Sequence, residues 1–225
     1  GIDFRNLVRF PASGKDKPID WRRRNVANRA EKRLLIPVGG GKDSIVTMEL
    51  LKKSGARCTL LRMEPHPIID EVAHISGLPL LTMRRTLSPT LFELNAKGAL
   101  NGHVPITAYL SVLASVTALL YGFDAVVMSN EGSADYGNVL FHGREVNHQW
   151  SKSFGAERLI AEYLREWVSR DAEYFSLLRP LTELHVTKLF CEHSRYFEAF
   201  TSCNKNWKIA GVPLSPAGER AGVRA

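Results

Sequence analysis

The chain has 225 residues, of which 44% are hydrophobic and 24% charged, enough to bury the core of one large α/β domain. No uninterrupted apolar stretch approaches the roughly 20 residues that span a bilayer, and the start lacks the charged-then-apolar pattern of a secretion leader. The three cysteines, Cys58, Cys191 and Cys203, are too far apart and odd in number for a disulfide framework. We therefore expect a cytoplasmic globular protein without a membrane partner.

The charge balance favours anionic ligands. Lysine and arginine outnumber aspartate and glutamate by 30 to 23, a formal charge of +7, which attracts nucleotides, phosphorylated metabolites or nucleic acid. Many of these cations lie in residues 1–32, which we interpret as a basic N-terminal arm or the remnant of a longer N-terminal region. Between Lys15 and Arg33, Trp21 is the one aromatic residue interleaved with these cations, so nucleic acid is an alternative partner rather than the expected one.

Short apolar runs alternate with helical patterns over residues 33–209, which we predict to be one domain, followed by a disordered tail at 210–225. Predicted strands cover Leu34–Val38, Arg57–Met63, Leu78–Met83, Phe123–Ser129 and Tyr174–Leu178. Predicted helices cover Asp43–Lys53, Pro67–Ser76, a short stretch from Ser88, Pro105–Tyr121, Phe154–Val168 and a stretch from Thr182. The last strand and helix either extend the same sheet or form a small subdomain.

Strands that alternate with helices predict an α/β fold, a parallel sheet of about five strands with helices on both faces. Right-handed crossovers place the loops that follow the strands at one edge of such a sheet, where ligands bind.

Three glycines stand between the first predicted strand and the first predicted helix. Gly39, Gly40 and Gly41 let the backbone approach a ligand closely and adopt positive φ. The start of the helix offers unpaired N–H groups and the positive end of a dipole, which together bind phosphate. The sequence therefore predicts a phosphate-binding turn at this point.

The three residues after the glycines are polar. Lys42 adds a positive charge and the hydroxyl of Ser44 adds a donor. Asp43 would repel bare phosphate, so we interpret it as a helix cap or as the carboxylate that recruits Mg²⁺.

Two other phosphate-binding motifs fit this turn less well. A Walker A loop fails because Gly41-Lys42 is followed by Asp43, and Ile36 stands where the earlier glycine is required. The dinucleotide fingerprint fits better, since Ser44 replaces only its third glycine and Glu64 lies about 20 residues on. Charged residues inside the turn argue against it, although it remains the second interpretation of the fold.

Gly39–Ser44 resembles the Ser-Gly-Gly-x-Asp-Ser loop of the N-type ATP pyrophosphatases, the PP-loop superfamily, with Gly39 in place of the serine. The resemblance implies an enzyme that splits ATP into AMP and pyrophosphate. It also implies that the turn, with Lys42 and Ser44, holds the departing pyrophosphate, and that Met63–Glu64 lies near the adenine.

Polar residues are dense after the predicted third and fourth strands, and several groups of them resemble the pattern of the MurL-type epimerases. These groups are Asn101–Pro105, Ser129–Glu131 with Ser133-Ala134, Val146–Ser153, Tyr174–Ser176, Leu178–Leu181 and Ser202–Asn204. Because buried polar groups need partners, we expect a ligand-lined loop at this edge, with Asn130 and Glu131 among the nucleotide-binding residues; a solvent-exposed loop is the alternative.

The MurL-type resemblance implies an ATP- and Mg²⁺-dependent epimerase whose small-molecule substrate is a UDP-linked muramoyl dipeptide. ATP would adenylate the α-carboxylate of the terminal L-glutamate, and a base would then remove the α-proton so that the carbon inverts. Candidates for proton transfer or catalysis are His103, His148, Cys203 and Lys152, and candidates for holding anions are Lys152, Arg144 and Arg179.

Family members are longer and continue into a cysteine-rich stretch that this sequence does not show. Two other functions stay open at this point. One is a PP-loop enzyme that modifies a tRNA base or a deazapurine, and the other is a nucleotide-binding module without catalysis.

Overall fold

The structure, a computed structural model, describes residues 31–99, 105–137, 139–147 and 149–201. Its strands are β1 (Arg33–Pro37), β2 (Arg57–Met63), β3 (Leu80–Met83), β4 (Ala125–Met128), β5 (Val139–Phe141), β6 (Arg144–Val146) and β7 (Glu173–Ser176). Its α-helices are α1 (Lys42–Lys53), α2 (Pro67–Ser76), α3 (Pro89–Ala96), α4 (Ile106–Tyr121), α5 (Phe154–Tyr163) and α6 (Glu183–Cys191). Short 3-10 segments are η1 (Gly132–Asp135), η2 (Trp150–Lys152) and η4 (Ser194–Tyr196), and a π-helical turn, η3 (Leu164–Val168), continues α5.

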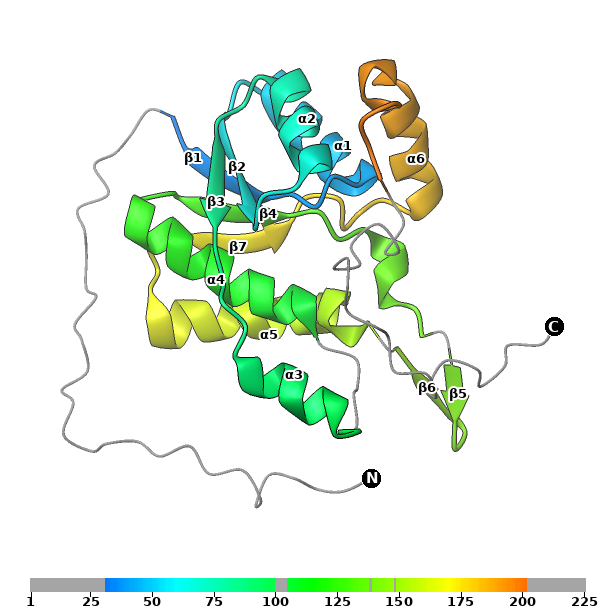
Figure 1. Ribbon diagram of the computed structural model, residues 1–225. Coiled ribbons are helices and arrows are strands. Elements are labelled where there is room, and N and C mark those ends of the chain that lie inside the picture. The colour runs from blue at the N-terminus through cyan, green and yellow to red at the C-terminus, as the bar shows by residue number, and fades with distance from the viewer. Residues whose placement is uncertain (1–30, 100–104, 138, 148, 202–225) are drawn as a thin grey trace.

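Five strands form one parallel sheet in the order β3-β2-β1-β4-β7. Helices α1, α2 and α6 cover one face, and α4 and α5 cover the other (Figure 1). The predicted α/β fold of about five parallel strands with helices on both faces is confirmed. The last strand, left open by the sequence, adds to this sheet beside β4.

The alternation of side chains along the strands divides the core in two. Ile36 in β1 and Val127 in β4 belong to the cluster under α1, α2 and α6, whereas Leu35 and Val126 belong to the cluster under α4 and α5. Because successive strand residues point to opposite faces, a strand buried on both faces must be apolar throughout. This requirement explains the uninterrupted apolar runs that identified these strands in the sequence.

Helix ends follow their sequence signals closely. Pro67 begins α2, where the His66 side chain accepts a hydrogen bond from the Ile68 N–H, and Gly77 ends it at φ 69°. Gly122 ends α4 in the same left-handed conformation. The Thr182 hydroxyl caps α6.

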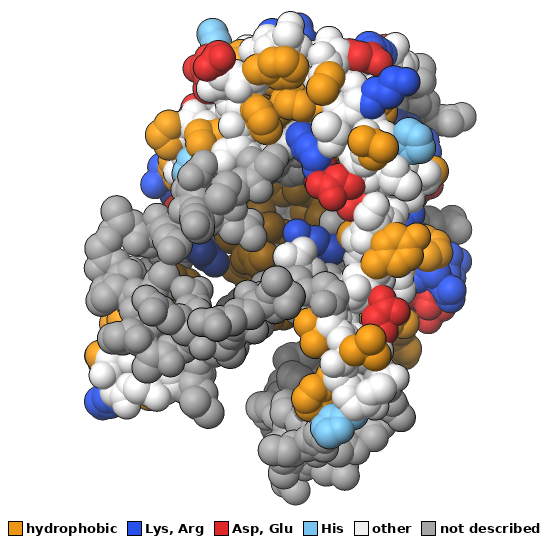
Figure 2. All heavy atoms as spheres, turned by 90° about the vertical axis from the view of Figure 1, so that its right-hand side faces the viewer, with side chains coloured by type: hydrophobic (Ala, Val, Ile, Leu, Met, Phe, Trp, Pro, Cys, Tyr) orange, Lys and Arg blue, Asp and Glu red, His pale blue; other side chains and the backbone are white. Residues whose placement is uncertain are grey.

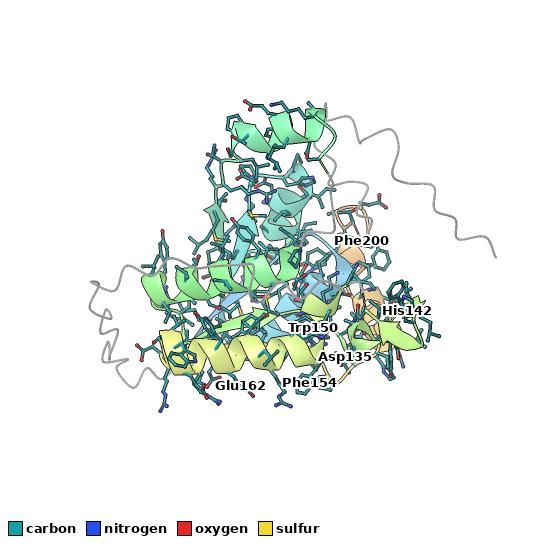
Figure 3. The ribbon with its side chains drawn as sticks, turned by 90° about the horizontal axis from the view of Figure 1, so that it is seen from below. Asp135, His142, Trp150, Phe154, Glu162 and Phe200 are labelled. Atoms are coloured by element: carbon teal, nitrogen blue, oxygen red, sulfur yellow. The ribbon has the colours of Figure 1, made fainter. Side chains whose placement is uncertain are left out.

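The polar stretch 130–153 contains a β-hairpin that the sequence did not predict. Strands β5 and β6 pair antiparallel, joined by His142 and Gly143, whose φ values are 50° and 72°. Two positive φ values in a two-residue loop are typical of a tight hairpin turn, which favours Gly at one position. The hairpin projects beside the main sheet and carries His142 away from the core (Figures 1 and 3).

No helix in the described part of the chain is long and apolar enough to cross a membrane.

Candidate phosphate-binding site

The glycine-rich turn lies between β1 and α1, at the edge of the sheet where the carboxyl ends of the parallel strands meet (Figure 1). Gly40 has φ +75°, and a Cβ on it would stand 2.9 Å from Ile68 Cγ2. A Cβ on Gly39 would meet nothing within 4 Å. The turn therefore needs glycine at position 40 for its own conformation, whereas position 39 leaves open space toward which a ligand can approach.

The N-terminus of helix α1 has no side-chain cap. Its N-cap is Gly41, and no side chain caps it, so the predicted capping role of Asp43 is not the one seen. The Ser44 hydroxyl donates to the Gly41 carbonyl at 2.9 Å, and Ser44 is buried. An uncapped helix start with glycines before it has the donors and the dipole that bind phosphate.

Lys42 is held between two carboxylates. Its Nζ lies 2.8 Å from Asp43 Oδ1 and 3.5 Å from Glu183 Oε1. Burial disfavours the charged ammonium, but the hydrogen bonds and charges of Asp43 and Glu183 outweigh burial and raise the pKa of Lys42. The raised pKa favours the charged form of Lys42 at the start of α1, the form that attracts phosphate.

Glu183 was not selected from the sequence. It is the first residue of α6, and its backbone N–H donates to the Ser133 hydroxyl at 3.2 Å, which ties α6 to the loop after β4. A carboxylate in the first turn of a helix is ordinary in sequence, so only the fold brings it to Lys42.

The end of β2 contributes Glu64, predicted to lie near the adenine. Its φ is 66°, and its carboxylate accepts the backbone N–H of Arg85 while its own N–H donates to Met83 O at 2.8 Å. A left-handed non-glycine residue is uncommon, and here it joins the ends of β2 and β3 at the carboxyl edge.

The loop after β4 brings polar groups to the same edge, since β4 is the neighbour of β1. The Ser129 hydroxyl is buried and finds no hydrogen-bond partner within the described residues. Asn130 Nδ2 donates to Ser176 Oγ at 3.2 Å, and the Glu131 carboxylate accepts the Ser133 N–H at 2.6 Å, capping η1. An unpartnered buried hydroxyl is costly, which favours a ligand group at this edge.

Arg179, which follows β7, connects its own segment to three others. Its guanidinium donates to the carbonyl oxygens of Glu131 and Lys152, at 3.1 and 3.0 Å, and meets Glu157 Oε2 at 2.6 Å. Its side chain is 12% exposed, and its Nε is buried without a hydrogen-bond partner among the described residues. These contacts position the segments around it, and its expected role in holding a substrate anion stays a prediction. Through these contacts Arg179 bridges the backbone of Lys152, a predicted catalytic residue, and the backbone of Glu131.

The remaining predicted residues have no structural test. His103, His148 and Cys203 lie outside the described residues. In the described part of the chain no group of three or more His, Cys, Asp or Glu could hold a metal, so a Mg²⁺ ion at Asp43 would need phosphate oxygens and water as its other ligands.

Figure 2, which faces the carboxyl edge, shows a hollowed surface with basic and acidic side chains around it and hydrophobic ones deeper. An apolar cavity lies elsewhere, between α4 and α5. Its lining includes Val112, Trp150, Ile160 and Tyr163. Figure 3 shows Trp150 near Asp135 and Phe154 at the start of α5. Trp150, which belongs to one of the motifs that carry the family resemblance, is 54% exposed and lines this cavity.

The fold is an α/β protein with a parallel five-stranded sheet, and an uncapped, lysine-bearing glycine turn lies at its carboxyl edge, a geometry suited to phosphate. The residues present fit the phosphates of a nucleotide, because the turn supplies space, donors and a fixed cation. The family is shown by the sequence itself. The chain belongs to the MurL N-terminal domain family, whose model matches residues 4–177, and the resemblance to MurL-type epimerases is confirmed.

Curated relatives carry the name UDP-N-acetyl-alpha-D-muramoyl-L-alanyl-L-glutamate epimerase. Those from Salinispora tropica and Xanthomonas oryzae pv. oryzae are each 46% identical, over 80% and 79% of this chain, and one from a Micromonospora species is 47% identical over 79%. The chain spans about two fifths of their length, 40%, 39% and 40% respectively.

Two solved structures share less. A predicted tRNA methyltransferase subunit from Methanocaldococcus jannaschii is 15% identical, with a TM-score of 0.44 over 71% of this chain and 76% of its own. NMN synthetase from Francisella tularensis is 14% identical, with a TM-score of 0.42 over 76% of this chain and 63% of its own.

Proposed function

We propose that this chain carries the ATP-binding part of an epimerase that inverts the terminal L-glutamate of UDP-N-acetylmuramoyl-L-alanyl-L-glutamate, a step in making peptidoglycan precursors. The observation that carries the proposal is the 46–47% identity to epimerases of that name across about four fifths of the chain. The relatives are longer, so the proposal assigns the nucleotide-binding part of the reaction to the described residues.

The glycine turn supports the use of ATP. The N–H groups at the start of α1 and the Lys42 ammonium would hold the β- and γ-phosphates, which leave as pyrophosphate. Asp43, 40% exposed, would turn from Lys42 to a Mg²⁺ ion that neutralises the phosphates. Asn130 and Glu131 lie in the loop after the neighbouring strand, and Glu64 at the end of β2, where the base and ribose of the nucleotide would be held.

Adenylation explains how a glutamate α-carbon becomes acidic enough to invert. The α-carboxylate oxygen attacks the α-phosphorus of ATP, pyrophosphate leaves, and an anion becomes an electron-withdrawing mixed anhydride. A base then takes the α-proton and a proton returns on the other face, after which water releases AMP and the D-glutamyl product. The groups proposed for the proton steps are His103, His148, Cys203 and Lys152.

Pyrophosphate release tests this function directly. Purified protein is incubated with ATP and Mg²⁺, with and without UDP-N-acetylmuramoyl-L-alanyl-L-glutamate, and Lys42→Met is the matched control. We expect release that depends on the acceptor and is lost in the variant, and solvent deuterium at the glutamate α-carbon. ATP binding without release would instead support a nucleotide-binding module, and release with a tRNA acceptor would support a different PP-loop enzyme.

A further inference from the structure

The glycine turn is covered by a segment far from it in sequence. The Thr201 N–H donates to the Gly40 carbonyl at 2.9 Å, and the Thr201 carbonyl oxygen would lie 3.3 Å from a Cβ on Gly41. Thr201 is 7% exposed. A carbonyl oxygen repels phosphate, so a donor that holds the Gly40 carbonyl also helps to fix which peptide groups of the turn face an anion.

The same segment is anchored at a second point on α1. Tyr196 is fully buried, and its hydroxyl donates to Glu49 Oε1 at 2.6 Å. Arg195 lies 2.7 Å from Glu49 Oε2, and Lys52 Nζ lies 3.2 Å from Glu49 Oε1. Glu49 stands seven residues after Lys42, about two turns further along the helix that begins at the turn.

The partners of Glu49 favour its ionised form. Burial opposes ionisation, but hydrogen bonds from Tyr196 and Lys52 and the charges of Lys52 and Arg195 outweigh burial and lower the pKa of Glu49. A carboxylate that is 5% exposed is stable only with such partners, and removing one donor leaves part of a buried charge uncompensated. Loss of the Tyr196 hydroxyl would therefore weaken the anchor, although Arg195 and Lys52 would still contact Glu49.

Hydrogen bonds and ring packing connect the anchored Tyr196 to Thr201. The Ala199 N–H donates to the Tyr196 carbonyl at 3.0 Å. Phe200, labelled in Figure 3, packs its ring 4.6 Å from that of Phe190 in α6, and Phe197 lies 5.4 Å from the same ring. Residues 196–201 are thus held at both ends, by Glu49 in α1 and by Gly40 just before α1.

We infer that Glu49 and Tyr196 are positioning residues that hold residues 196–201 over the glycine turn and so set the affinity of the turn for the phosphates of a nucleotide. The inference rests on the proposed binding of ATP for its effect on affinity, but not for the anchor itself. Neither residue belongs to the glycine turn, and each would act through Thr201 and the Gly40 peptide.

The chain offers a matched control for Tyr196→Phe. Tyr174 in β7 is also buried, and its hydroxyl makes one buried hydrogen bond, 2.7 Å to Ser111 Oγ, under the opposite face of the sheet. Tyr174→Phe deletes the same atom from the same residue type without touching residues 196–201. Glu49→Gln is the conservative partner variant, since its amide oxygen can still accept from Tyr196.

Two measurements on the full chain test the inference. Hydrogen–deuterium exchange is followed in peptides that cover residues 38–44 and 197–201, and ATP affinity is measured by calorimetry with Mg²⁺. We expect Tyr196→Phe to speed exchange in both peptides and to weaken ATP binding about five- to tenfold, less than the full loss of a hydrogen bond to a charged group, because Thr201 keeps its own bond to Gly40. Tyr174→Phe should lower Tm but leave both readouts within about twofold of the parent protein, and Glu49→Gln should fall between the two.

The two measurements separate failure of the inference from failure of the proposed function. Equal exchange at residues 38–44 in Tyr196→Phe and Tyr174→Phe would overturn the anchor, whatever the affinity for ATP. Faster exchange in Tyr196→Phe with ATP affinity unchanged would overturn the link to phosphate binding. Absence of ATP binding by the parent protein would refute the proposed use of ATP, with the exchange result still deciding the anchor.

Discussion

The Arg179 guanidinium and the Glu157 carboxylate meet at 2.6 Å, with 12% and 9% of their side chains exposed. Glu157 also accepts the Ser176 N–H at 3.0 Å through its other oxygen. This ion pair fastens α5, the end of β7 and the loops around the carboxyl edge into one unit. The polar loops that carry most of the family motifs depend on it for their relative positions.

Arg179→Ala should therefore lower the free energy of unfolding by about 3 kcal/mol or more, because it leaves a buried carboxylate without its cation. Urea titration measures this. Arg158→Ala is the matched control, since Arg158 pairs with Glu162 on the exposed surface of α5 at 3.5 Å and should cost no more than about 0.5 kcal/mol. Similar losses in the two variants would contradict a structural role specific to Arg179.

Gly40→Ala should destabilise the fold by about 2 kcal/mol and abolish ATP binding, because Cβ combines a left-handed φ with a clash. Two controls separate these causes. Gly143 has nearly the same φ, +72°, with nothing within 4 Å of a Cβ, and Gly39 has open space. We expect Gly143→Ala to lower Tm through backbone strain, without loss of ATP binding. We expect Gly39→Ala to leave Tm unchanged.

Glu183→Gln should tighten ATP binding about two- to threefold at low salt, because it removes an exposed negative charge that competes for Lys42. The gain should vanish near 0.5 M salt, where screening removes it. Lys42→Met should abolish binding at either salt concentration. Weaker binding in Glu183→Gln would show instead that this carboxylate assists the nucleotide, as a metal ligand would.

Glu49 should make the fold sensitive to acid. Its pKa is lowered in the folded state, so its stabilisation is complete above the unfolded pKa, about 4.3, and is lost as pH falls through the folded pKa. The difference in unfolding free energy between the parent protein and Glu49→Gln should be largest above pH 5 and shrink below pH 4. Denaturant titrations from pH 3 to 7 measure it, and a constant difference would refute an ionised Glu49.

Cys58 should be inert in the folded protein. Burial raises the pKa of its thiol to about 11, so at pH 8 its thiolate fraction is about a hundredfold below that of an ordinary thiol. Mass spectrometry after iodoacetamide treatment should find the exposed Cys191 modified and Cys58 modified only after unfolding. Above about pH 9 the unfolded thiol ionises first, so this group lowers stability as pH rises.

Much of the fold could be predicted because it depends on local sequence. Arg57–Met63 and Pro67–Ser76 were predicted with the bounds observed, since a buried apolar run and a Pro-to-Gly helix carry their own signals. The third and fourth strands are shorter than predicted, because strand bounds depend on which neighbours pair. The β5–β6 hairpin was missed because its two-residue loop is His-Gly, a weak signal beside Asn-Gly or Asp-Gly.

The sequence by itself determined the parallel α/β architecture, the family and the position of the glycine turn, because periodicity, composition and a contiguous motif are all readable along the chain. Only the tertiary structure decided which distant groups serve that turn. Glu183 reaches Lys42, the Thr201 N–H donates to the Gly40 carbonyl, and the two terminal nitrogens of Arg179 donate to neighbouring segments. These contacts join residues far apart in sequence, and whether a charged side chain meets a partner or a ligand depends on packing that no local pattern records.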